Sequence, residues 1–213
     1  MKFLITAGPT REPIDPVRYI SNRSSGKMGY AIAQAALDAG HEVVLISGPV
    51  ALPAPPPAQM VRVTTADEMY DAVHAHLAGI DIAVMCAAVA DFKPAACAPR
   101  KIKKHEGVPR IDLVPTRDIL ASLGALPAKN FLLVGFAAET DELEKNARQK
   151  LEKKGCDVVI GNDVGASGVG FESDENEVTI FLPDQSSRVF PRASKRDLAN
   201  DLVKILCELK QNS

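Results

Sequence analysis

Positively charged side chains gather at two places where they could bind an anion. Four of them lie within five residues of a long segment without clear periodicity: Arg100, Lys101, Lys103 and Lys104. Lys150 and Lys154 stand four residues apart on a predicted helix, where like charges repel by about 0.2–0.5 kcal/mol unless an anion lies between them. A triphosphate would suit both groups. Taken alone, each group is also explained by solvation of a charge run or by screening from nearby glutamates.

A third candidate for anion binding is the cluster Ser24, Ser25 and Gly26, which opens a predicted helix over residues 25–39. Free backbone N–H groups and the positive end of the helix dipole favour an anion at such a place. The segment is not a P-loop, because Met28 stands where Ser or Thr would bind Mg²⁺ and Ser21 stands where the first Gly belongs. The alternative is a plain N-cap by one of the two serines.

Two further residues follow apolar runs that read as strands. Asp91 comes after the small residues Ala87 and Ala88, which would let a ligand approach the backbone, and its carboxylate could bind a ribose or Mg²⁺. Phe136 ends another run and could flank a nucleobase. The alternatives are an Asx turn for the Asp and a core position for the Phe. The four histidines show no triad or metal-ligand spacing.

The elements that must position these residues alternate between strand and helix. Apolar runs over 3–7, 42–47, 61–64, 82–88, 131–137 and 157–160 read as strands, and helical spacing occupies 25–39, 66–77, 119–126 and 141–154. A hairpin over 177–182 and 187–190 and a helix from about Ser194 follow a glycine-rich stretch at 165–170. This order predicts a Rossmann-like, doubly wound α/β fold with a mostly parallel sheet, a C-terminal β-hairpin extension and one domain over 1–213. In such sheets ligands bind beyond the carboxyl ends of the strands.

Composition limits the classes of partner. The chain has 213 residues, a 46% hydrophobic share and a net charge of −2, which is typical of a globular protein without a general electrostatic footprint for nucleic acid or an anionic membrane. No apolar run is long enough to span a membrane or to serve as a signal peptide. Four scattered cysteines without a CxxC pair argue against metal and disulfide sites and favour the cytoplasm.

The loops together resemble one known family. The run ITAGPTREPIDPVRYISN at 5–22, continued by SSGKMG at 24–29, resembles the bacterial phosphopantothenate-cysteine ligases, also called phosphopantothenoylcysteine synthetases. The resemblance extends through AAVADF at 87–92, KIKK at 101–104, VGFAAET at 134–140 and ARQK at 147–150, and so covers most of the chain. Many bacteria fuse this domain behind a flavin-dependent decarboxylase, which is absent here, so FMN is not expected. Whether the chain is free-standing or excised stays open.

The resemblance implies a reaction and a set of residues. The carboxylate of 4'-phosphopantothenate attacks the α-phosphorus of CTP with Mg²⁺ present, pyrophosphate leaves, and the amine of L-cysteine then displaces CMP from the acyl-cytidylate. The family's nucleotide site corresponds to Met85, Cys86, Ala87, Asp91, Lys101, Arg117, Asp118, Ile119, Leu120, Phe136, Lys150 and Lys154. Its substrate site corresponds to Arg18, Asn22, Ser24, Ser25, Gly26, Ala87 and Ala88, with Asn22, Lys101 and Arg18 in the reaction itself. Arg117 departs from the family, which often has Pro there.

Family members are homodimers in which the partner completes the site, so a homodimer is expected. The preference for CTP over ATP and the Mg²⁺ ligands are left open. A nicotinamide-dependent reductase would share the fold, but the first strand is not followed by the glycine fingerprint, and Tyr19, Tyr30 and Tyr70 lack a Lys four positions later. A non-catalytic nucleotide-binding module is the other alternative. Pyrophosphate release that depends on phosphopantothenate separates the ligase from both.

Overall fold

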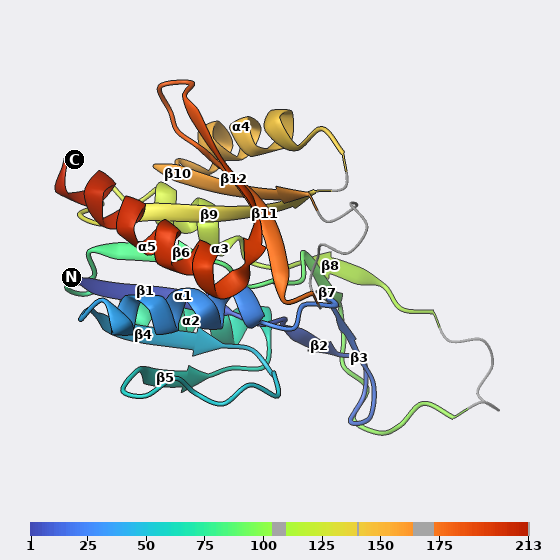
Figure 1. Cartoon of the computed structure of the whole chain (residues 1–213). Helices are drawn as coiled ribbons and strands as arrows, with labels where there is room; N and C mark the ends of the chain where they lie inside the picture. The colour runs from blue at the N-terminus through green and yellow to red at the C-terminus, as the bar shows by residue number, and fades with distance from the viewer. Residues whose placement is uncertain (104–109, 140, 164–172, 213) are drawn as a thin grey trace.

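The protein is built on one eight-stranded sheet with the order β12-β11-β10-β9-β6-β1-β4-β5. A computed structural model describes residues 1–103, 110–139, 141–163 and 173–212 (Figure 1). The strands are β1 (Lys2–Ala7), β4 (Glu42–Ser47), β5 (Gln59–Arg62), β6 (Ile82–Met85), β9 (Leu132–Glu139), β10 (Val158–Asp163), β11 (Glu175–Phe181) and β12 (Ser187–Ser194). All neighbours from β5 to β10 are parallel, and β11 and β12 continue the sheet antiparallel. The predicted doubly wound sheet with a hairpin extension is confirmed.

Helices cover both faces because side chains along each buried strand alternate between two apolar cores. Phe3 and Ile5 of β1 pack in the core under α1 (Lys27–Asp38) and α5 (Lys195–Gln211), whereas Leu4 packs in the core under the other helices. Those helices are α2 (Ala66–Ala75), α3 (Ile119–Gly124) and α4 (Leu143–Lys154). Figure 1 shows α1 and α5 side by side on the near face. The alternation therefore fixes which helix starts can meet at the carboxyl edge of the sheet.

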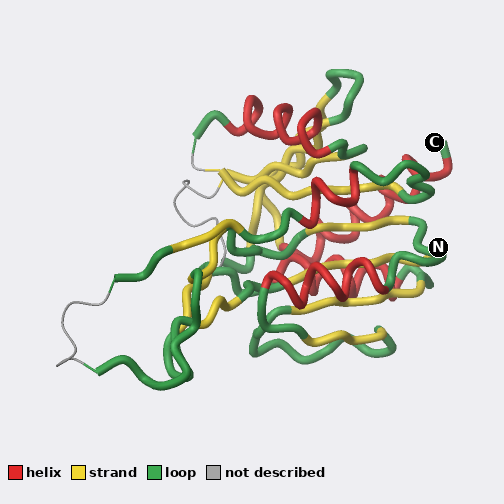
Figure 2. The backbone as a smooth tube through the Cα atoms, turned by 180° about the vertical axis from the view of Figure 1, so that it is seen from behind, coloured by secondary structure: helices red, strands yellow, loops and turns green. Residues whose placement is uncertain are grey.

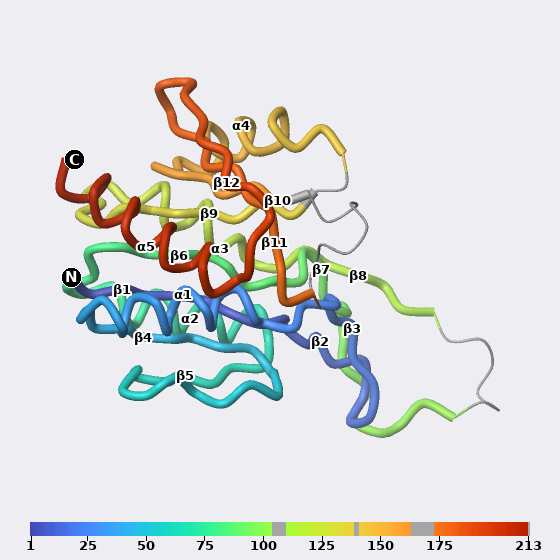
Figure 3. Tube along the Cα trace, viewed as in Figure 1, coloured from blue at the N-terminus to red at the C-terminus, as the bar shows by residue number. Residues whose placement is uncertain are grey.

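Two antiparallel ribbons project beyond the sheet, and the sequence analysis missed both. β2 (Arg11–Pro13) pairs with β3 (Tyr19–Ser21), and β7 (Phe92–Pro94) pairs with β8 (Leu113–Pro115), inside segments that we had read as loops. Three-residue strands that contain proline carry too little periodicity to be recognised. The ribbons contact each other through β2 and β7, and we call residues 11–21 with the described parts of 92–115 the arm. Figures 2 and 3 show the arm extending away from the sheet, on the side opposite the two termini.

Several predicted boundaries also shift. β5 lies two residues earlier than expected, β6 ends at Met85 instead of at 88, and β9 and β12 run further than predicted. Two helix ends have recognisable caps: Gly155 ends α4 with φ 60°, and Ser194 accepts a hydrogen bond from the Asp197 N–H at the start of α5. The predicted glycine-rich stretch at 165–170 and Lys104 lie outside the described residues.

Across the described parts of the chain, no helix combines the length and apolar character needed to cross a bilayer. Cys86, Cys97, Cys156 and Cys207 are all free thiols.

Candidate functional site

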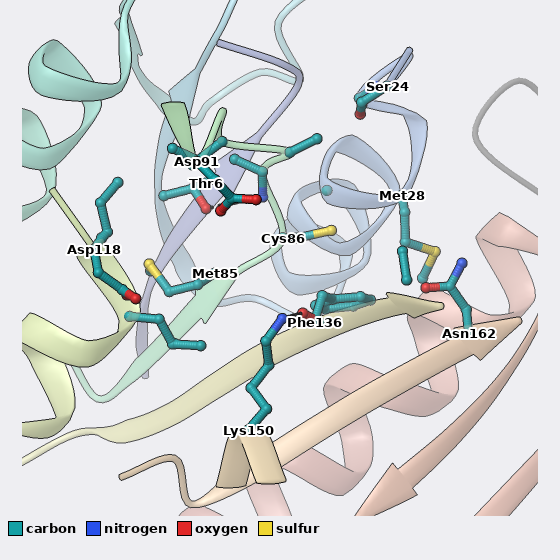
Figure 4. Close-up of a pocket in the computed structure, with 18 of the residues that line it drawn as sticks. Thr6, Ser24, Met28, Met85, Cys86, Asp91, Asp118, Phe136, Lys150 and Asn162 are labelled. Atoms are coloured by element: carbon teal, nitrogen blue, oxygen red, sulfur yellow. Dashed lines mark hydrogen bonds between the residues drawn. The ribbon is translucent and has the colours of Figure 1, made fainter. Parts of the chain in front are cut away.

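A cavity of about 600 Å³ opens at the carboxyl edge of the sheet, between the ends of β6 and β9 and the start of α1 (Figure 4). Most residues that the sequence analysis assigned to a nucleotide or substrate site line it. They are Ser24, Ser25, Gly26, Met85, Cys86, Ala87, Ala88, Asp91, Arg117, Asp118, Ile119, Leu120, Phe136, Lys150 and Lys154. The elements that carry them are far apart in sequence, and the parallel sheet brings their ends together.

The start of α1 forms one wall of this cavity and lies close to β1. A Cβ added to Gly29 would stand 2.7 Å from the Cβ of Ala7, so the helix can approach the strand only because this residue is Gly. The N-cap is Gly26, in the left-handed conformation with φ 78°, and no side chain caps the helix. The predicted alternative of a serine cap is therefore wrong. The positive end of the helix dipole lies at the cavity, where it favours an anion.

The loop after β6 is held by hydroxyl and amide side chains from the end of β1 and from the loop that follows it. Oγ1 of Thr6 accepts from the Ala87 N–H at 3.1 Å, and Oγ1 of Thr10 accepts from the Ala90 N–H at 3.0 Å. Nδ2 of Asn22 donates to the carbonyl oxygens of Ala88 at 3.0 Å and Val89 at 3.3 Å. Asn22 thus holds the loop that carries Asp91 in place, and it is not among the residues that line the cavity of this chain.

The opposite wall carries cations from α4. Nζ of Lys150 donates to the carbonyl oxygen of Phe136 at 2.6 Å, and Nζ of Lys154 forms an ion pair with Asp118 at 2.5 Å. Asp118 also caps α3 by accepting from the Ala121 N–H at 2.8 Å. Burial raises the pKa of the Asp118 carboxyl, but the Ala121 N–H and Lys154 together lower it below its ordinary value. The half-buried Phe136 lines the cavity beside Lys150, as Figure 4 shows.

Arg117 lines the cavity but is held by α2. Its guanidinium pairs with Asp67 at 3.1 Å and Asp71 at 2.7 Å, and it stacks over the ring of Tyr70 at 4.0 Å from the centroid. These partners account for the departure from the family pattern at this position, because they give the guanidinium a structural role without a ligand.

Arg18 and Lys101 lie on the arm, outside the lining of this cavity. Arg18 pairs with the buried Asp15 at 2.5 Å and donates to the carbonyl oxygen of Ile102 at 3.2 Å, which ties the two ribbons' segments together. The Arg18 guanidinium holds the pKa of Asp15 far below its usual range. Lys101 is exposed. In a single chain Arg18 and Lys101 are therefore not among the residues that line the cavity with the other predicted substrate-site and nucleotide-site residues.

The residues that line the cavity bear on two kinds of chemistry, nucleophilic attack by a cysteine and binding of a metal ion. Burial raises the pKa of Cys86 to about 12, so this residue stays a thiol at neutral pH and is not a nucleophile. Among the described residues, no group of three or more His, Cys, Asp or Glu side chains could hold a metal ion. Mg²⁺ commonly binds through one or two carboxylates together with the phosphates of a substrate, and the exposed Asp91 in the cavity fits that mode.

The sequence analysis missed several polar residues that line the cavity, among them Lys27, Asn162, Asn176 and Lys195. Signals for them exist. The asparagines occupy positions in β10 and β11 whose alternation faces an apolar core, and both are buried. The lysines are the first residues of α1 and α5, where the helix dipole disfavours a cation.

The chain matches, over residues 1–209, the family described as the DNA/pantothenate metabolism flavoprotein C-terminal domain. The chain belongs to this family. It is 50% identical over 204 residues to the coenzyme A biosynthesis bifunctional protein CoaBC of Vibrio vulnificus (strain YJ016), covering 95% of this chain and 51% of that protein. The corresponding protein of Bacillus subtilis (strain 168) is 46% identical over 211 residues, covering 99% of this chain and 52% of that protein. The chain thus spans about half the length of these relatives.

Solved structures agree with this membership. The crystal structure of the C-terminal domain of a CoaBC protein superposes with a TM-score of 0.84 at 40% identity, covering 100% of this chain and 98% of that one. A Cab2 variant in complex with phosphopantothenate-cysteine has a TM-score of 0.77 at 18% identity, covering 99% of this chain and 86% of that one, which shows a shared fold.

Proposed function

We propose that this protein joins 4'-phosphopantothenate to L-cysteine and uses CTP to activate the carboxylate. The observation that carries the proposal is the cavity itself, where the uncapped start of α1 faces Lys150 and Lys154 across a floor of small residues. Such a cavity suits a polyanionic nucleotide beside a second anionic substrate. Supporting this, the family relatives are coenzyme A biosynthesis proteins, and the domain that they share with this chain is their C-terminal half.

The proposed reaction has two steps that need no histidine base. The substrate carboxylate attacks the α-phosphorus of CTP, the bond to the β-phosphate oxygen breaks, and pyrophosphate leaves. The amine of cysteine then attacks the acyl carbon of the acyl-cytidylate and releases CMP. Because the first nucleophile is already an anion, the protein's contribution is to hold two like-charged reactants together and to neutralise the phosphates.

Residues of this chain fit those tasks. Lys150 and Lys154 bind the nucleotide, and Phe136 lies against it. The backbone of Ala87 and Ala88 allows a close approach of the substrate, because neither residue has a side chain beyond Cβ. Asp91 would bind Mg²⁺ together with the phosphates, and the cation would neutralise charge that develops on the leaving group.

We further propose that a second copy of the chain completes the site. The arm carries exposed apolar side chains: Val17 is 60% exposed, Phe92 53%, Leu113 49% and Tyr19 48%. Apolar residues gathered on a projecting arm are typical of an interface, and a homodimer would carry Arg18 and Lys101 of one chain to the cavity of the other. A reducing compartment such as the cytoplasm suits an enzyme with four free cysteines.

The decisive experiment is release of pyrophosphate by the purified chain with CTP and Mg²⁺. Release that requires 4'-phosphopantothenate, followed by formation of phosphopantothenoylcysteine when cysteine is added, supports the proposal. Substituting ATP for CTP tests the nucleotide preference. Nucleotide binding without any phosphopantothenate-dependent release would refute catalysis and leave a non-catalytic binding module.

The shared site is tested by mixing two inactive variants, Lys101→Gln and Lys154→Gln. If each site takes Lys101 from one chain and Lys154 from the other, a dimer of the two different variants has one site with both lysines and one site with neither. Half of the dimers in an equal random mixture are of this kind, so about a quarter of all sites are intact. About a quarter of wild-type activity is therefore expected after mixing. No recovery, in a mixture that demonstrably exchanges subunits, would place both lysines in the site of the same chain or remove one from the reaction.

A further inference from the structure

Lys27, Asn162, Asn176 and Lys195 all line the cavity, and Figure 4 shows Asn162 close to Met28 of α1. Asn162 and Asn176 come from the neighbouring strands β10 and β11, each at the carboxyl edge of the face covered by α1 and α5. A β-bulge between Asn176 and Val178 marks the position where β11 leaves its regular pairing with β12. Polar side chains thus take the last positions on β10 and β11 of the sheet face that is otherwise apolar and buried.

The two lysines among these four residues are placed against electrostatic preference. Each is the first residue of its helix, where the macrodipole favours anions. Only 6% of Lys195 is exposed, and its Nζ donates to the main-chain carbonyl oxygen of Ser173 at 2.6 Å. Burial, and next the charge of Lys27, lower the pKa of Lys195. The charge of Asp174 offsets part of this lowering, and an anion bound between the two lysines would offset more of it.

The chain holds this arrangement in place through one short segment. Nζ of Lys27 pairs with the carboxylate of Asp174 at 2.6 Å, and the backbone N–H of Lys195 donates to the Asp174 carbonyl oxygen at 2.9 Å. The Asp174 side chain is 88% exposed, so a phosphate oxygen could replace it as the partner of Lys27 without removing a buried group. The two lysines are therefore prepared for an anion that comes and goes.

We infer that Lys27 and Lys195, with the amides of Asn162 and Asn176, form a phosphate-binding subsite separate from Lys150 and Lys154. The inference rests on the proposed function, which brings two phosphate-bearing molecules to this cavity. The subsite binds either the pyrophosphoryl group that leaves the nucleotide or the phosphate monoester of phosphopantothenate. Two lysines match the charge of either group, and the amide N–H groups supply further donors.

The test is calorimetric titration with inorganic pyrophosphate and, separately, with 4'-phosphopantothenate, each with Mg²⁺ present. Wild type is compared with Lys27→Gln, Lys195→Gln and Lys195→Arg, and with Lys204→Gln as the matched control on an exposed position of the same helix α5. Loss of one charge-assisted hydrogen bond is expected to weaken binding of one of the two ligands about tenfold or more. Lys195→Arg should recover part of the affinity, and Lys204→Gln should bind as wild type.

The ligand whose affinity falls identifies the group that occupies the subsite. Equal binding of both ligands to wild type and to Lys27→Gln would overturn the inference, and this variant decides the question even if Lys195→Gln fails to fold, because the Lys27 side chain is 34% exposed. The binding readout requires no turnover. A wild type that binds pyrophosphate through these residues but makes no product would refute the proposed function and leave the subsite standing.

Discussion

Neutralising the two lysines of α4 gives a quantitative test of the nucleotide site. The double variant Lys150→Gln, Lys154→Gln removes both cations from one wall of the cavity and keeps side chains of similar reach. Lys153→Gln is the matched control, because Lys153 is exposed on the same helix and outside the cavity lining. All three positions lie in the last two turns of α4, so helix propensity changes little.

The effect of the two substitutions on the stability of the free protein can be separated from their effect on CTP binding. The Lys154–Asp118 pair is 32% and 46% exposed, so its loss should cost about 0.2–1 kcal/mol. The Lys150 bond to the Phe136 carbonyl is a charged hydrogen bond in a half-buried setting, worth about 1.5–3 kcal/mol at most. These losses affect the melting temperature without ligand. Comparing each variant with and without CTP cancels them.

Ligand-induced stabilisation then isolates the charge effect. At a CTP concentration of about 100 times the wild-type Kd, binding adds about 2.7 kcal/mol. If each lysine is worth about tenfold in affinity, the double variant has a Kd near the ligand concentration, and the gain falls to about 0.4 kcal/mol. For a chain of this size that is a decrease in the CTP-induced Tm shift from about 5–11 °C to about 1–2 °C.

The assay is a thermal melt with Mg²⁺ alone and with Mg²⁺ and CTP. Lys153→Gln should keep the full shift. If the double variant also keeps the full shift, Lys150 and Lys154 are a solvated face and the nucleotide site lies elsewhere in the cavity. If the CTP-induced shift falls equally in the double variant and in Lys153→Gln, the effect is a general loss of positive charge, and the reasoning from position fails.

Two more predictions follow from contacts outside the α4 wall. Asn22→Asp replaces the donor to the carbonyl oxygens of Ala88 and Val89 with an anion, so it should slow product formation. If Asn22 guides the second step, mass spectrometry of quenched reactions should show that the acyl-cytidylate accumulates. An unchanged rate of product formation would contradict both the structural role and the role in the second step. The pKa values of His41 and His74 are lowered, chiefly by burial, so the unfolded chain binds more protons and urea midpoints should fall as the pH drops from about 7.5 to 5.5. A His41→Asn, His74→Asn variant should show a smaller fall, and an equal fall would assign the dependence to other groups.

The order of the elements and the location of the cavity were predictable from sequence. The continuous run Glu42–Ser47 indicated a strand covered on both faces, and the spacing of Met69 and Val73 indicated a helix with one buried side. Alternating strands and helices predict a parallel sheet, in which the carboxyl ends of neighbouring strands lie at the same edge. The loops after β1 and β6 therefore come close to the end of β9. Sequence reasoning therefore brought together residues that are more than 100 positions apart.

What the sequence did not predict depends on contacts between segments. The ribbon β7–β8 has an apolar side that is exposed in the single chain, so no local burial pattern marks it. The role of Asn22 toward a substrate stays a prediction, whereas the hydrogen bonds from its amide to the carbonyl oxygens of Ala88 and Val89, about 66 positions away, were not predicted. Lys195 was missed because its helix was read for its apolar spacing, while its burial is set by Ser173 and Asp174.

The cavity and the arm are built from different kinds of elements, and this difference sets what each can do. The cavity walls are the ends of buried strands and helices, and rigid elements can hold Phe136, Lys150 and the start of α1 in fixed relation. The arm rests on short strands tied by contacts such as the Asp15–Arg18 pair, and it extends away from the sheet. Arg18 and Lys101 lie on the arm outside the lining of this cavity, and in the proposed homodimer they would add positive charge to the cavity of the second copy only once the dimer has formed. Activity per chain should then depend on dimer concentration, which links assembly to neutralisation of the phosphates.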